Sequence, residues 1–324
     1  MKTKVRVSKA EFDELTRPKL KLFLSVDIVG STELKHQGGN AKAQPWLSFF
    51  FAFFANFPTL FSEALAEQCQ LGRVLEAKLW KSLGDELIFT AELKSRHDAG
   101  AYLRAFRLAL LKAVENWKVT KDNSNLLLKG TAWIAGFPVG NAEIPLESSS
   151  TADTDGRDYI GPHVDAGFRL KEHSTPRKLI VSADLAYLLL GTENPGLDLF
   201  FDGDVSLKGV IRNKPYPIIW ADCFAPGELS DLSIHHLKDK LLGRGKADLS
   251  QLRDYLKLWL ADSQGHVPIP FIINDPFEDL QAPLDFERKR EAVIAELQNH
   301  IFVQEDEESK GKDQLHAALV DYLK

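Results

Sequence analysis

The segment LSVDIVGST, residues Leu24–Thr32, decides the fold because a buried strand ends in it on an acidic residue. The preceding apolar run, Lys21–Val26, predicts a fully buried strand. Asp27 follows at the end of that strand and offers the hard oxygen ligands that Mg²⁺ and Mn²⁺ prefer. The backbone carbonyl of Ile28 is a candidate for a further ligand. Asp27 and Ile28 therefore begin a candidate metal site.

A glycine-containing turn follows Asp27 and leads into a helix. Backbone N–H groups of such a turn and of the helix start can bind phosphate oxygens. The residues expected to do so are Val29, Gly30, Ser31 and Thr32. The alternative is an aspartate that caps the helix, with Ser31 or Thr32 as other caps, and the segment alone does not decide between the two.

A second acidic residue lies in a short hairpin further along the chain. The segment LWKSLGDELIF, Leu79–Phe89, places Gly84 and Asp85 between two β-rich runs. A Gly-Asp turn is common in surface hairpins, so Asp85 alone does not predict a metal site. Its significance comes from its place after the first motif in the expected order of strands.

The predicted elements follow the order strand, helix, strand, strand, helix, strand. They are strand Lys21–Val26, helix Pro45–Gln70, strands Leu75–Lys81 and Leu87–Ala91, helix Asp98–Lys118 and strand Leu126–Ala135. This order is typical of the ferredoxin-like βαββαβ arrangement with an antiparallel sheet, an α/β (α+β) fold. The first strand and the hairpin then lie side by side, and Asp27 and Asp85 are expected to converge at one edge.

The chain beyond this core divides at the Ala225–Gly227 step, which predicts a first domain of residues 1–225 and a helical C-terminal domain of residues 226–324. The first domain is expected to continue with a polar loop Gly140–Arg157, helix Gly161–Glu172, strand Lys178–Val181, helix Ala183–Leu190 and strands Val205–Ile211 and Pro217–Ala221. The second is expected to contain helices Ile234–Leu242, Leu249–Leu260, Phe286–Phe302 and, after an acidic link, Leu315–Leu323. The sequence assigns no chemistry to this second domain.

Composition limits the partners of the protein. A net charge of −6 and a pI near 5.9 give no general attraction to nucleic acid. Two cysteines, Cys69 and Cys223, indicate reduced thiols of a cytosolic protein. The N-terminus has no apolar signal core. The apolar run Trp46–Phe61 is shorter than the ~20 residues of a membrane span. We therefore expect a freely diffusing cytoplasmic protein with no membrane partner.

The motifs VDIVGST and KSLGDE together resemble the signature of class III adenylate and guanylate cyclases, over about Lys19 to Asp222. Those enzymes carry a strand that ends in Asp, then Gly and Ser/Thr, and later a Lys-x-x-Gly-Asp hairpin. The resemblance implies that Asp27 and Asp85 hold two divalent ions, Mn²⁺ or Mg²⁺, in each site. It places Lys81 where the family has a lysine that contacts the base.

A third segment, DYIGPHVDAGFRL at Asp158–Leu170, strengthens the resemblance. Asp158, Asp165 and Arg169 stand where the family has an Asp, an Asn and an Arg, and Arg169 would reach the α-phosphate as negative charge develops. Spacing alone favours a surface salt bridge between Asp165 and Arg169. Asp165 also departs from the family, because an ionised aspartate cannot donate a hydrogen bond to the ribose. Lys208, in VSLKGV, matches a lysine that contacts the triphosphate, or is a solvated strand-end lysine.

The segments DYIGPHVDAGFRL and TPRKLIVSADLAYLL are similar to the pyrimidine cyclases of the bacterial Pycsar antiphage system. That similarity implies conversion of UTP to cyclic UMP, or of CTP to cyclic CMP, as a second messenger for a separate effector. UTP is the favoured substrate. The pair Lys81 and Asp158 is instead similar to the adenine-reading pair of adenylate cyclases. Rings in Phe49–Phe57 are expected in the core or a dimer contact, although some could reach the base pocket.

The family resemblance also implies a head-to-tail homodimer with shared sites. Metal ligands Asp27 and Asp85 would come from one subunit and Arg169 from the other, giving two equivalent sites. A non-enzyme alternative is a degenerate cyclase fold that only binds nucleotide or another protein. Retention of both aspartates and Arg169 argues against it, while Asp165 keeps it open.

Overall fold

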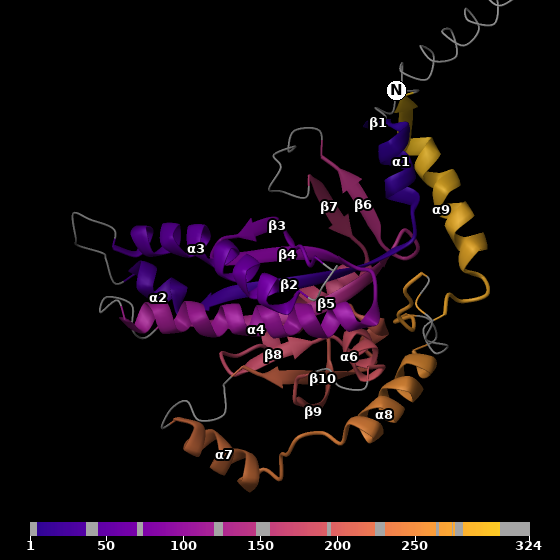
Figure 1. Ribbon diagram of the computed structural model, residues 1–324. Helices are drawn as coiled ribbons and strands as arrows, with labels where there is room; N and C mark the ends of the chain where they lie inside the picture. The colour runs from indigo at the N-terminus through magenta and orange to yellow at the C-terminus, as the bar shows by residue number, and fades with distance from the viewer. Residues whose placement is uncertain are drawn as a thin grey trace, which may run out of the picture.

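The computed structural model describes residues 5–36, 45–69, 74–119, 126–146, 156–192, 196–223, 231–263, 266–273, 275 and 281–304 (Figure 1). The expected boundary at Ala225–Gly227 and the expected helix Leu315–Leu323 lie outside these residues.

A seven-stranded sheet in the order β3-β4-β2-β5-β8-β10-β9 forms the centre of the described molecule. Its strands are β2 (Lys19–Val29), β3 (Lys78–Leu83), β4 (Glu86–Leu93), β5 (Leu127–Phe137), β8 (Lys178–Val181), β9 (Leu199–Ser206) and β10 (Pro215–Asp222). Neighbouring strands pair antiparallel except β5 and β8, which pair parallel. The first four strands, with α3 (Pro45–Gln68) and α4 (Arg96–Val119), make a βαββαβ unit. The ferredoxin-like core predicted from the sequence is confirmed.

Helices α3, α4 and α6 (Ala183–Leu190) pack on one face of the sheet. Successive side chains of a strand point to opposite faces, and every second residue of β2 is buried under these helices. These residues are Leu20, Leu22, Leu24, Val26 and Ile28. The intervening residues, among them Phe23, Ser25 and Asp27, therefore face the other side of the sheet.

The phenylalanine-rich helix α3 contributes rings to this core. Phe57 and Phe61 each contact the rings of Phe89 and Phe106, whereas Phe51 is 68% exposed. Judged by length and composition alone, the segment Trp46–Gln68 is long and apolar enough to cross a membrane. Buried core helices of soluble proteins also meet these two criteria. The buried rings pack on the face opposite Asp27, so they serve the core and do not reach that side of the sheet.

The other face of the sheet carries α5 (Pro162–Leu170) and a two-stranded ribbon, β6 (Ala142–Pro145) with β7 (Arg157–Ile160). The prediction of a polar loop over Gly140–Arg157 is wrong at both ends of that range, because Ala142–Pro145 and Arg157–Ile160 pair with each other as this ribbon. The expected helix Gly161–Glu172 is confirmed up to Leu170, after which Lys171–His173 forms a 3-10 turn.

The described residues after β10 pack against the rest of the described chain at two places. Helix α8 (Leu249–Asp262) buries Leu252, Leu256 and Leu260 in the main core. Strand β11 (Ile301–Gln304) follows α9 (Phe286–His300) and pairs parallel with β1 (Val5–Ser8), beside α1 (Lys9–Thr16). Figure 1 shows α1 and α9 side by side, and α7 (Asp231–Leu241) with α8 along the lower side. The division after residue 225 stays a prediction.

One expected strand is displaced. The sequence predicted Val205–Ile211, whereas β9 spans Leu199–Ser206 and the chain then turns into the 3-10 segment Ile211–Asn213. Gly209 at φ +76° belongs to the turn. Leu207, Val210 and Ile211 are apolar because they pack into the core from that turn, so their pattern imitated a strand.

Candidate active site

Strand register brings the two predicted metal ligands to one end of the sheet. Asp27 lies opposite Glu86 across β2 and β4, and opposite Lys129 across β2 and β5. Asp85 directly precedes Glu86 in the β3–β4 hairpin, where Gly84 adopts φ +68°. Glycine adopts this left-handed backbone conformation readily, and the conformation allows a tight turn between the two strands. The prediction that the two carboxylates share one end of the sheet is borne out in the register.

The sequence predicted a strand that ends at Val26 and a turn directly after Asp27, whereas β2 runs two residues past Asp27 and ends at Val29, so the turn begins at Gly30. Gly30 adopts φ +82°, and α2 (Ser31–His36) begins directly after it. The Gly30 carbonyl accepts a hydrogen bond from the N–H of Leu34. The Ile28 side chain is buried in the core on the helix-covered face of the sheet, and the residue pairs with Leu128 of β5. Thr32 is exposed. Ser31 is buried, and its hydroxyl donates a hydrogen bond to the Asp85 carboxylate.

Lysines partly balance the two carboxylates. Lys129 Nζ lies 3.1 Å from Asp27 Oδ2, and Lys35 Nζ lies 3.8 Å from Asp85 Oδ1. Burial nevertheless raises the pKa of Asp27, and the negative charges of Asp85 and Glu86 raise it further, against the opposing effect of Lys129. The end of the sheet is therefore a place where an added positive charge is favourable.

The donor set fits a hard divalent cation that keeps part of its coordination for substrate. Asp27 and Asp85 supply carboxylate oxygens, and the Ile28 carbonyl follows directly. Within the described ranges, no group of three or more His, Cys, Asp or Glu side chains could enclose an ion. Mg²⁺ and Mn²⁺ suit such a site, since they are held by one or two carboxylates together with substrate phosphates and water.

Glu86 is a functional candidate that the sequence reasoning missed. Its side chain is 8% exposed, accepts a hydrogen bond from the Ser25 hydroxyl and pairs with Lys171 Nζ at 2.6 Å. The signal was present, because Glu86 follows Asp85 directly and alternation along β4 places it on the same face as Asp27. Ser25 shares that face, two residues before Asp27.

The predicted base-reading pair is in contact. Lys81 Nζ lies 2.6 Å from Asp158 Oδ1, although the two residues come from β3 and β7. An irregularity in the β3–β4 register between Leu79 and Lys81 places Lys81 opposite Ile88. The ammonium group also lies 4.1 Å from the centre of the Trp80 ring. The structure thus brings Lys81 and Asp158 together on the same sheet face as Asp27.

An aromatic cluster supports the face between these groups. Its buried rings are Phe23, Trp80, Trp133, Phe137 and Tyr159. Helix α5 lies on this cluster through Gly167, where an added Cβ would stand 2.2 Å from the Trp133 ring. Glycine at position 167 therefore permits the close approach that seats α5 on β5.

Asp165 and Arg169 are both exposed on α5. Although four residues separate them, no ion pair joins them, and among the described residues no carboxylate pairs with Arg169. The salt-bridge alternative is therefore not realised in this structure. Arg169 presents a guanidinium group that is available to an anionic ligand, and Asp165 does not hold it in place.

Lys208 lies far from the other candidates within one chain. It is exposed in the turn that joins the end of β9 to the start of β10, on the strand at the edge of the sheet. The register through β10, β8 and β5 puts that turn at the opposite end of the sheet from Asp27. The structure does not bring Lys208 to the candidate site of its own chain.

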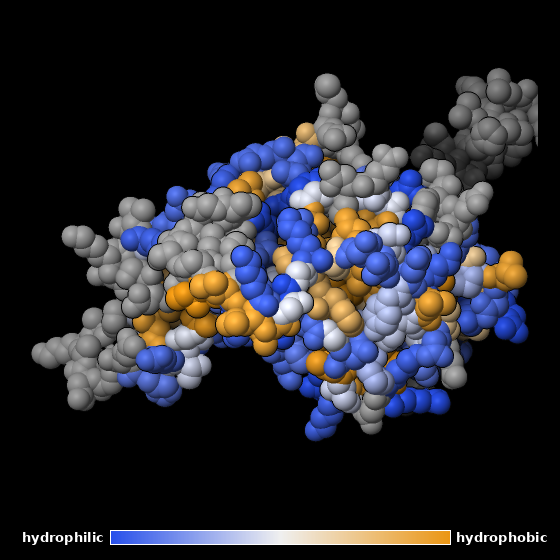
Figure 2. All heavy atoms as spheres, turned by 90° about the horizontal axis from the view of Figure 1, so that it is seen from below, coloured by the Kyte–Doolittle hydropathy of each residue, from blue (hydrophilic) through white to orange (hydrophobic). Residues whose placement is uncertain are grey.

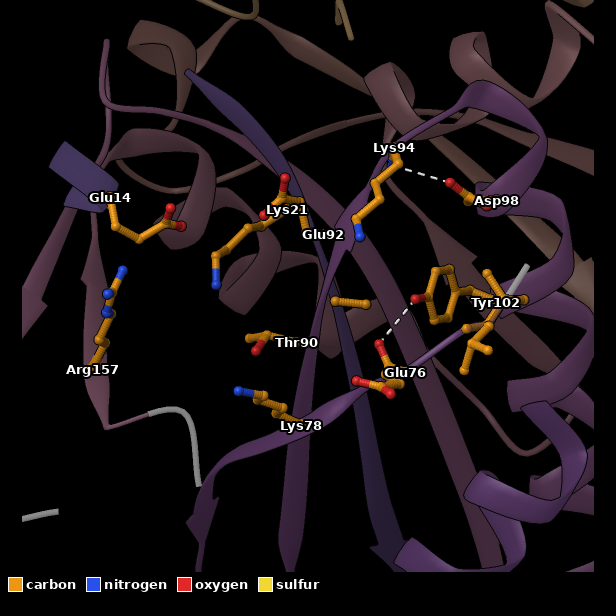
Figure 3. Close-up of a pocket in the computed structure, with 13 residues that line it drawn as sticks. Glu14, Lys21, Glu76, Lys78, Thr90, Glu92, Lys94, Asp98, Tyr102 and Arg157 are labelled. Atoms are coloured by element: carbon orange, nitrogen blue, oxygen red, sulfur yellow. Dashed lines mark hydrogen bonds between the residues drawn. The ribbon is translucent and has the colours of Figure 1, made fainter. Parts of the chain in front are cut away.

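A polar cavity of about 560 Å³ lies on the same face, toward the opposite end of β2 (Figure 3). Lys21, Lys78, Lys94 and Arg157 line it together with acidic residues such as Glu92. Lys21 precedes Asp27 by six residues, which is roughly 20 Å along a strand. The cavity is thus separate from the acidic end, and its nearly balanced charges identify no ligand class.

No protein-family model matches the chain, and a search of curated proteins finds no match. Among solved structures, the chain is similar to the adenylyl cyclase CyaB from P. aeruginosa, with 16% identity, 66% of this chain and 98% of that chain covered, and a TM-score of 0.44. It is similar to the guanylyl cyclase Cya2 at 16% identity, with 66% and 98% covered and a TM-score of 0.43. An adenylate/guanylate cyclase/hydrolase from Silicibacter pomeroyi shows 16% identity, 64% and 97% coverage and a TM-score of 0.43. Similarity at this level assigns no activity to this chain.

Proposed function

We propose that this protein is a class III nucleotidyl cyclase that converts UTP to 3′,5′-cyclic UMP and pyrophosphate. The product would serve as a second messenger in bacterial antiphage defence of the Pycsar type, acting on a separate effector. The observation that carries the cyclase proposal is the strand register, in which Asp27 lies opposite Glu86 and therefore beside Asp85. Two carboxylates remote in sequence thus meet at one end of the sheet.

The residues of this chain would divide the work as follows. Asp27 and Asp85, with the Ile28 carbonyl, would hold two divalent cations, Mn²⁺ or Mg²⁺. When bound, such ions supply Lewis acidity at the ribose 3′-oxygen and at the triphosphate. The segment Val29–Thr32, which joins the end of β2 to the start of α2, would place backbone N–H groups against the phosphates. Arg169 would donate hydrogen bonds to the α-phosphate oxygens as charge builds up on them.

The reaction is an intramolecular phosphoryl transfer. The ribose 3′-oxygen forms a bond to the α-phosphorus, the bond between that phosphorus and the bridging oxygen breaks, and pyrophosphate leaves with that oxygen. The proton of the 3′-hydroxyl is released to solvent. Because the protein forms no covalent bond, its residues act by positioning and by electrostatic stabilisation.

Base selection rests on Lys81 and Asp158, whose ion pair offers both a cation and an acceptor. Discrimination between bases is large when a buried donor or acceptor is left unpaired by the wrong one. We favour UTP from the resemblance of DYIGPHVDAGFRL, with CTP as the closest alternative. The contact between Lys81 and Asp158 specifically favours an adenylate cyclase as the second candidate.

The decisive assay incubates pure protein and Mn²⁺ with each of the four ribonucleoside triphosphates and identifies products by mass spectrometry. We expect cyclic UMP from UTP. The double variant Asp27→Asn/Asp85→Asn, purified in the same way, excludes a contaminating cyclase. Cyclic CMP or cyclic AMP as the main product would replace UTP by the corresponding alternative. Absence of any cyclic product from folded protein would contradict the cyclase proposal and favour a nucleotide-binding protein.

A further inference from the structure

A partly buried ion pair joins the acidic hairpin to the end of α5. Both oxygens of Glu86 accept hydrogen bonds from Lys171 Nζ, at 2.7 and 2.6 Å, and the Ser25 hydroxyl donates to the same carboxylate. The side chains of Glu86 and Lys171 are 8% and 22% exposed. Lys171 Nζ also lies 4.6 Å from the centre of the Phe168 ring. The lysine is therefore held on two sides.

The position of this pair in the chain gives it significance. Glu86 follows Asp85 directly, and Lys171 follows Arg169 by two residues. The N–H of Lys171 donates to the Arg169 carbonyl, and the Lys171 carbonyl accepts from the Ser174 hydroxyl at 2.7 Å. The last turn of α5 is thus tied by one side chain to the hairpin that bears a predicted metal ligand.

We propose that Glu86 and Lys171 are positioning residues that fix Arg169 relative to the Asp85 hairpin. This inference rests on the proposed cyclase function. Gly167 seats the middle of α5 on Trp133, and the Glu86–Lys171 pair sets the end of the helix, where Arg169 projects into solvent. An exposed arginine gains most catalytic value when the backbone that carries it is rigid, since small displacements strongly reduce transition-state stabilisation.

In the head-to-tail homodimer that the family resemblance implies, the pair would have a further effect. The Asp85 hairpin of one subunit serves one site, while Arg169 of the same subunit serves the other. Within a single chain, Glu86 and Lys171 therefore link the metal ligands of one site to Arg169, which serves the second site of the dimer. A disturbance at either residue is expected to act on both sites.

Three variants and a control separate this role from general packing. Lys171→Met keeps most of the apolar stem of the side chain and removes its charge. Glu86→Gln removes the opposite charge, and Lys171→Arg keeps a positive charge for the ion pair. The control is Lys112→Met, which removes an ion pair of 2.7 Å to Glu67 on the opposite face of the sheet. Steady-state kinetics give kcat and KM, and hydrogen exchange of metal-free, nucleotide-free protein reports on residues 169–174.

We expect Lys171→Met to lower kcat by about 10- to 100-fold with KM changed by less than about 3-fold, because Arg169 acts in the transition state. Lys171→Arg should recover most of kcat, and Lys112→Met should match wild type. The double variant Glu86→Gln/Lys171→Met should have a kcat no lower than that of the less active single variant, since the effects of removing the two partners of one interaction do not add. Exchange at residues 169–174 should accelerate in Lys171→Met and stay unchanged in the control.

Wild-type kcat in Lys171→Met, or unchanged exchange at residues 169–174, would overturn the positioning role while leaving the cyclase proposal standing. A higher Mn²⁺ requirement in Glu86→Gln but not in Lys171→Met would also overturn it, by making Glu86 a direct metal ligand. A wild-type protein that forms no cyclic product from any triphosphate defeats the cyclase proposal itself, and this inference with it.

Discussion

At the scale of single residues, Asp27 combines two properties that ordinary surface carboxylates lack. It lies two residues before the end of a buried strand, and burial raises its pKa above the ordinary value of 3.8 while the negative charges of Asp85 and Glu86 add to the effect. A group kept at a cost to folding is expected where function requires it. Its nearest positive partner, Lys129, is 27% exposed and offsets this cost only in part.

Asp27→Asn should abolish cyclase activity without loss of stability. Because the folded pKa of Asp27 is raised, wild type loses stability as pH increases from 3.8 toward that raised value. Asparagine does not titrate. The unfolding free energy of the variant minus that of wild type should therefore increase as pH rises over the same range. Urea unfolding of both proteins at several pH values measures the difference. If the difference instead decreases as pH rises, the effect of Lys129 on the pKa of Asp27 outweighs that of burial, and the account of Asp27 is wrong.

Arg169→Ala should slow turnover by ~100-fold or more, the scale of losing one donor to the transition state. Thermal unfolding should be unchanged, because the side chain is exposed and, among the described residues, pairs with no carboxylate. Arg288→Ala on α9 is the control, since that arginine side chain is 82% exposed and makes only a surface ion pair, at 3.8 Å to Asp285. Equal activity of the two variants would remove Arg169 from the proposed site.

At the scale of elements, α5 depends on close packing over the aromatic face. Gly167→Ala would place a methyl group 2.2 Å from atoms of Trp133, which is fully buried and cannot move aside. We expect a loss of roughly 1–3 kcal/mol in unfolding free energy and reduced activity, because α5 also carries Arg169. Gly136→Ala on β5 is the control, since nothing lies within 4 Å of its added Cβ. Equal stability of both variants in urea would contradict the observed seating of α5.

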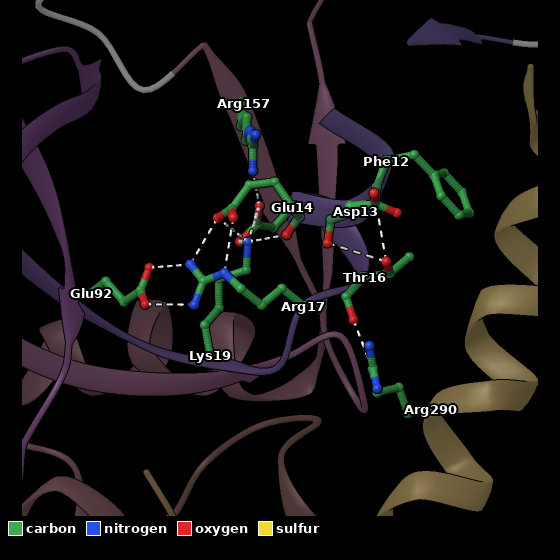
Figure 4. A network of polar contacts seen from close by, with 10 residues as sticks. Phe12, Asp13, Glu14, Thr16, Arg17, Lys19, Glu92, Arg157 and Arg290 are labelled. Atoms are coloured by element: carbon green, nitrogen blue, oxygen red, sulfur yellow. Dashed lines mark hydrogen bonds and ion pairs between the residues drawn. The ribbon is translucent and has the colours of Figure 1, made fainter. Parts of the chain in front are cut away.

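The start of β2 is held by a network of charges that joins α1 to β4 (Figure 4). Arg17 pairs with Glu14 at 2.9 Å and with Glu92 at 2.6 Å, and Lys19 Nζ lies 2.9 Å from Glu14. A hydrogen bond from Arg17, opposed by burial and aided by Lys19, lowers the pKa of Glu14 from 4.5 to about 2. The network ties the N-terminal helix to the sheet.

Glu14→Gln should lower stability at pH 7 by less than ~1 kcal/mol, because the pair is partly exposed to solvent. A lowered folded pKa means that the contribution of Glu14 is complete above pH 4.5 and is lost as pH falls toward 2. The difference between variant and wild type should therefore shrink over that interval in chemical denaturation. A difference that is constant from pH 7 to pH 3 would assign the effect to packing instead.

Much of the central fold was predictable because its signals are local. The periodicity of α4, the apolar run of β2 and the Gly-Asp hairpin each identify one element, and their order selects the βαββαβ unit. The ribbon of β6 with β7 and the pairing of β1 with β11 were not predictable, because short strands depend on a partner remote in sequence. Lys208 failed to join the other candidates for a similar reason, since the turn that carries it is fixed by sheet topology rather than by its own sequence.

The candidate site was predictable in its acidic part and less so in its supports. Asp27 and Asp85 each lie close to a glycine turn at the end of a strand, and such turns are visible in the sequence. Glu86 and Lys171 carry no motif, and their relation exists only once α5 lies on the sheet. The contact of Lys81 with Asp158 followed from resemblance, whereas its geometry depends on a register irregularity in β3 that the sequence does not reveal.

At the scale of the whole molecule, the head-to-tail homodimer that the family resemblance implies makes a quantitative prediction. Asp27→Asn and Arg169→Ala chains, each inactive alone, should regain activity when unfolded together and refolded as a mixture. Random pairing makes half of the dimers mixed, and each mixed dimer has one working site, so recovery should approach about a quarter of wild type. Separately refolded samples of each variant are the control. A mixture as inactive as either parent would place Asp27 and Arg169 in the same chain's site.

The most direct measurement is a crystal structure with Mn²⁺ and a UTP analogue that cannot be cyclised. We predict that the carboxylates of Asp27 and Asp85 from one subunit coordinate the same pair of cations, with Arg169 of the partner subunit against the α-phosphate. Asp27 and Asp85 directed to separate places, with no cation between them, would contradict the account.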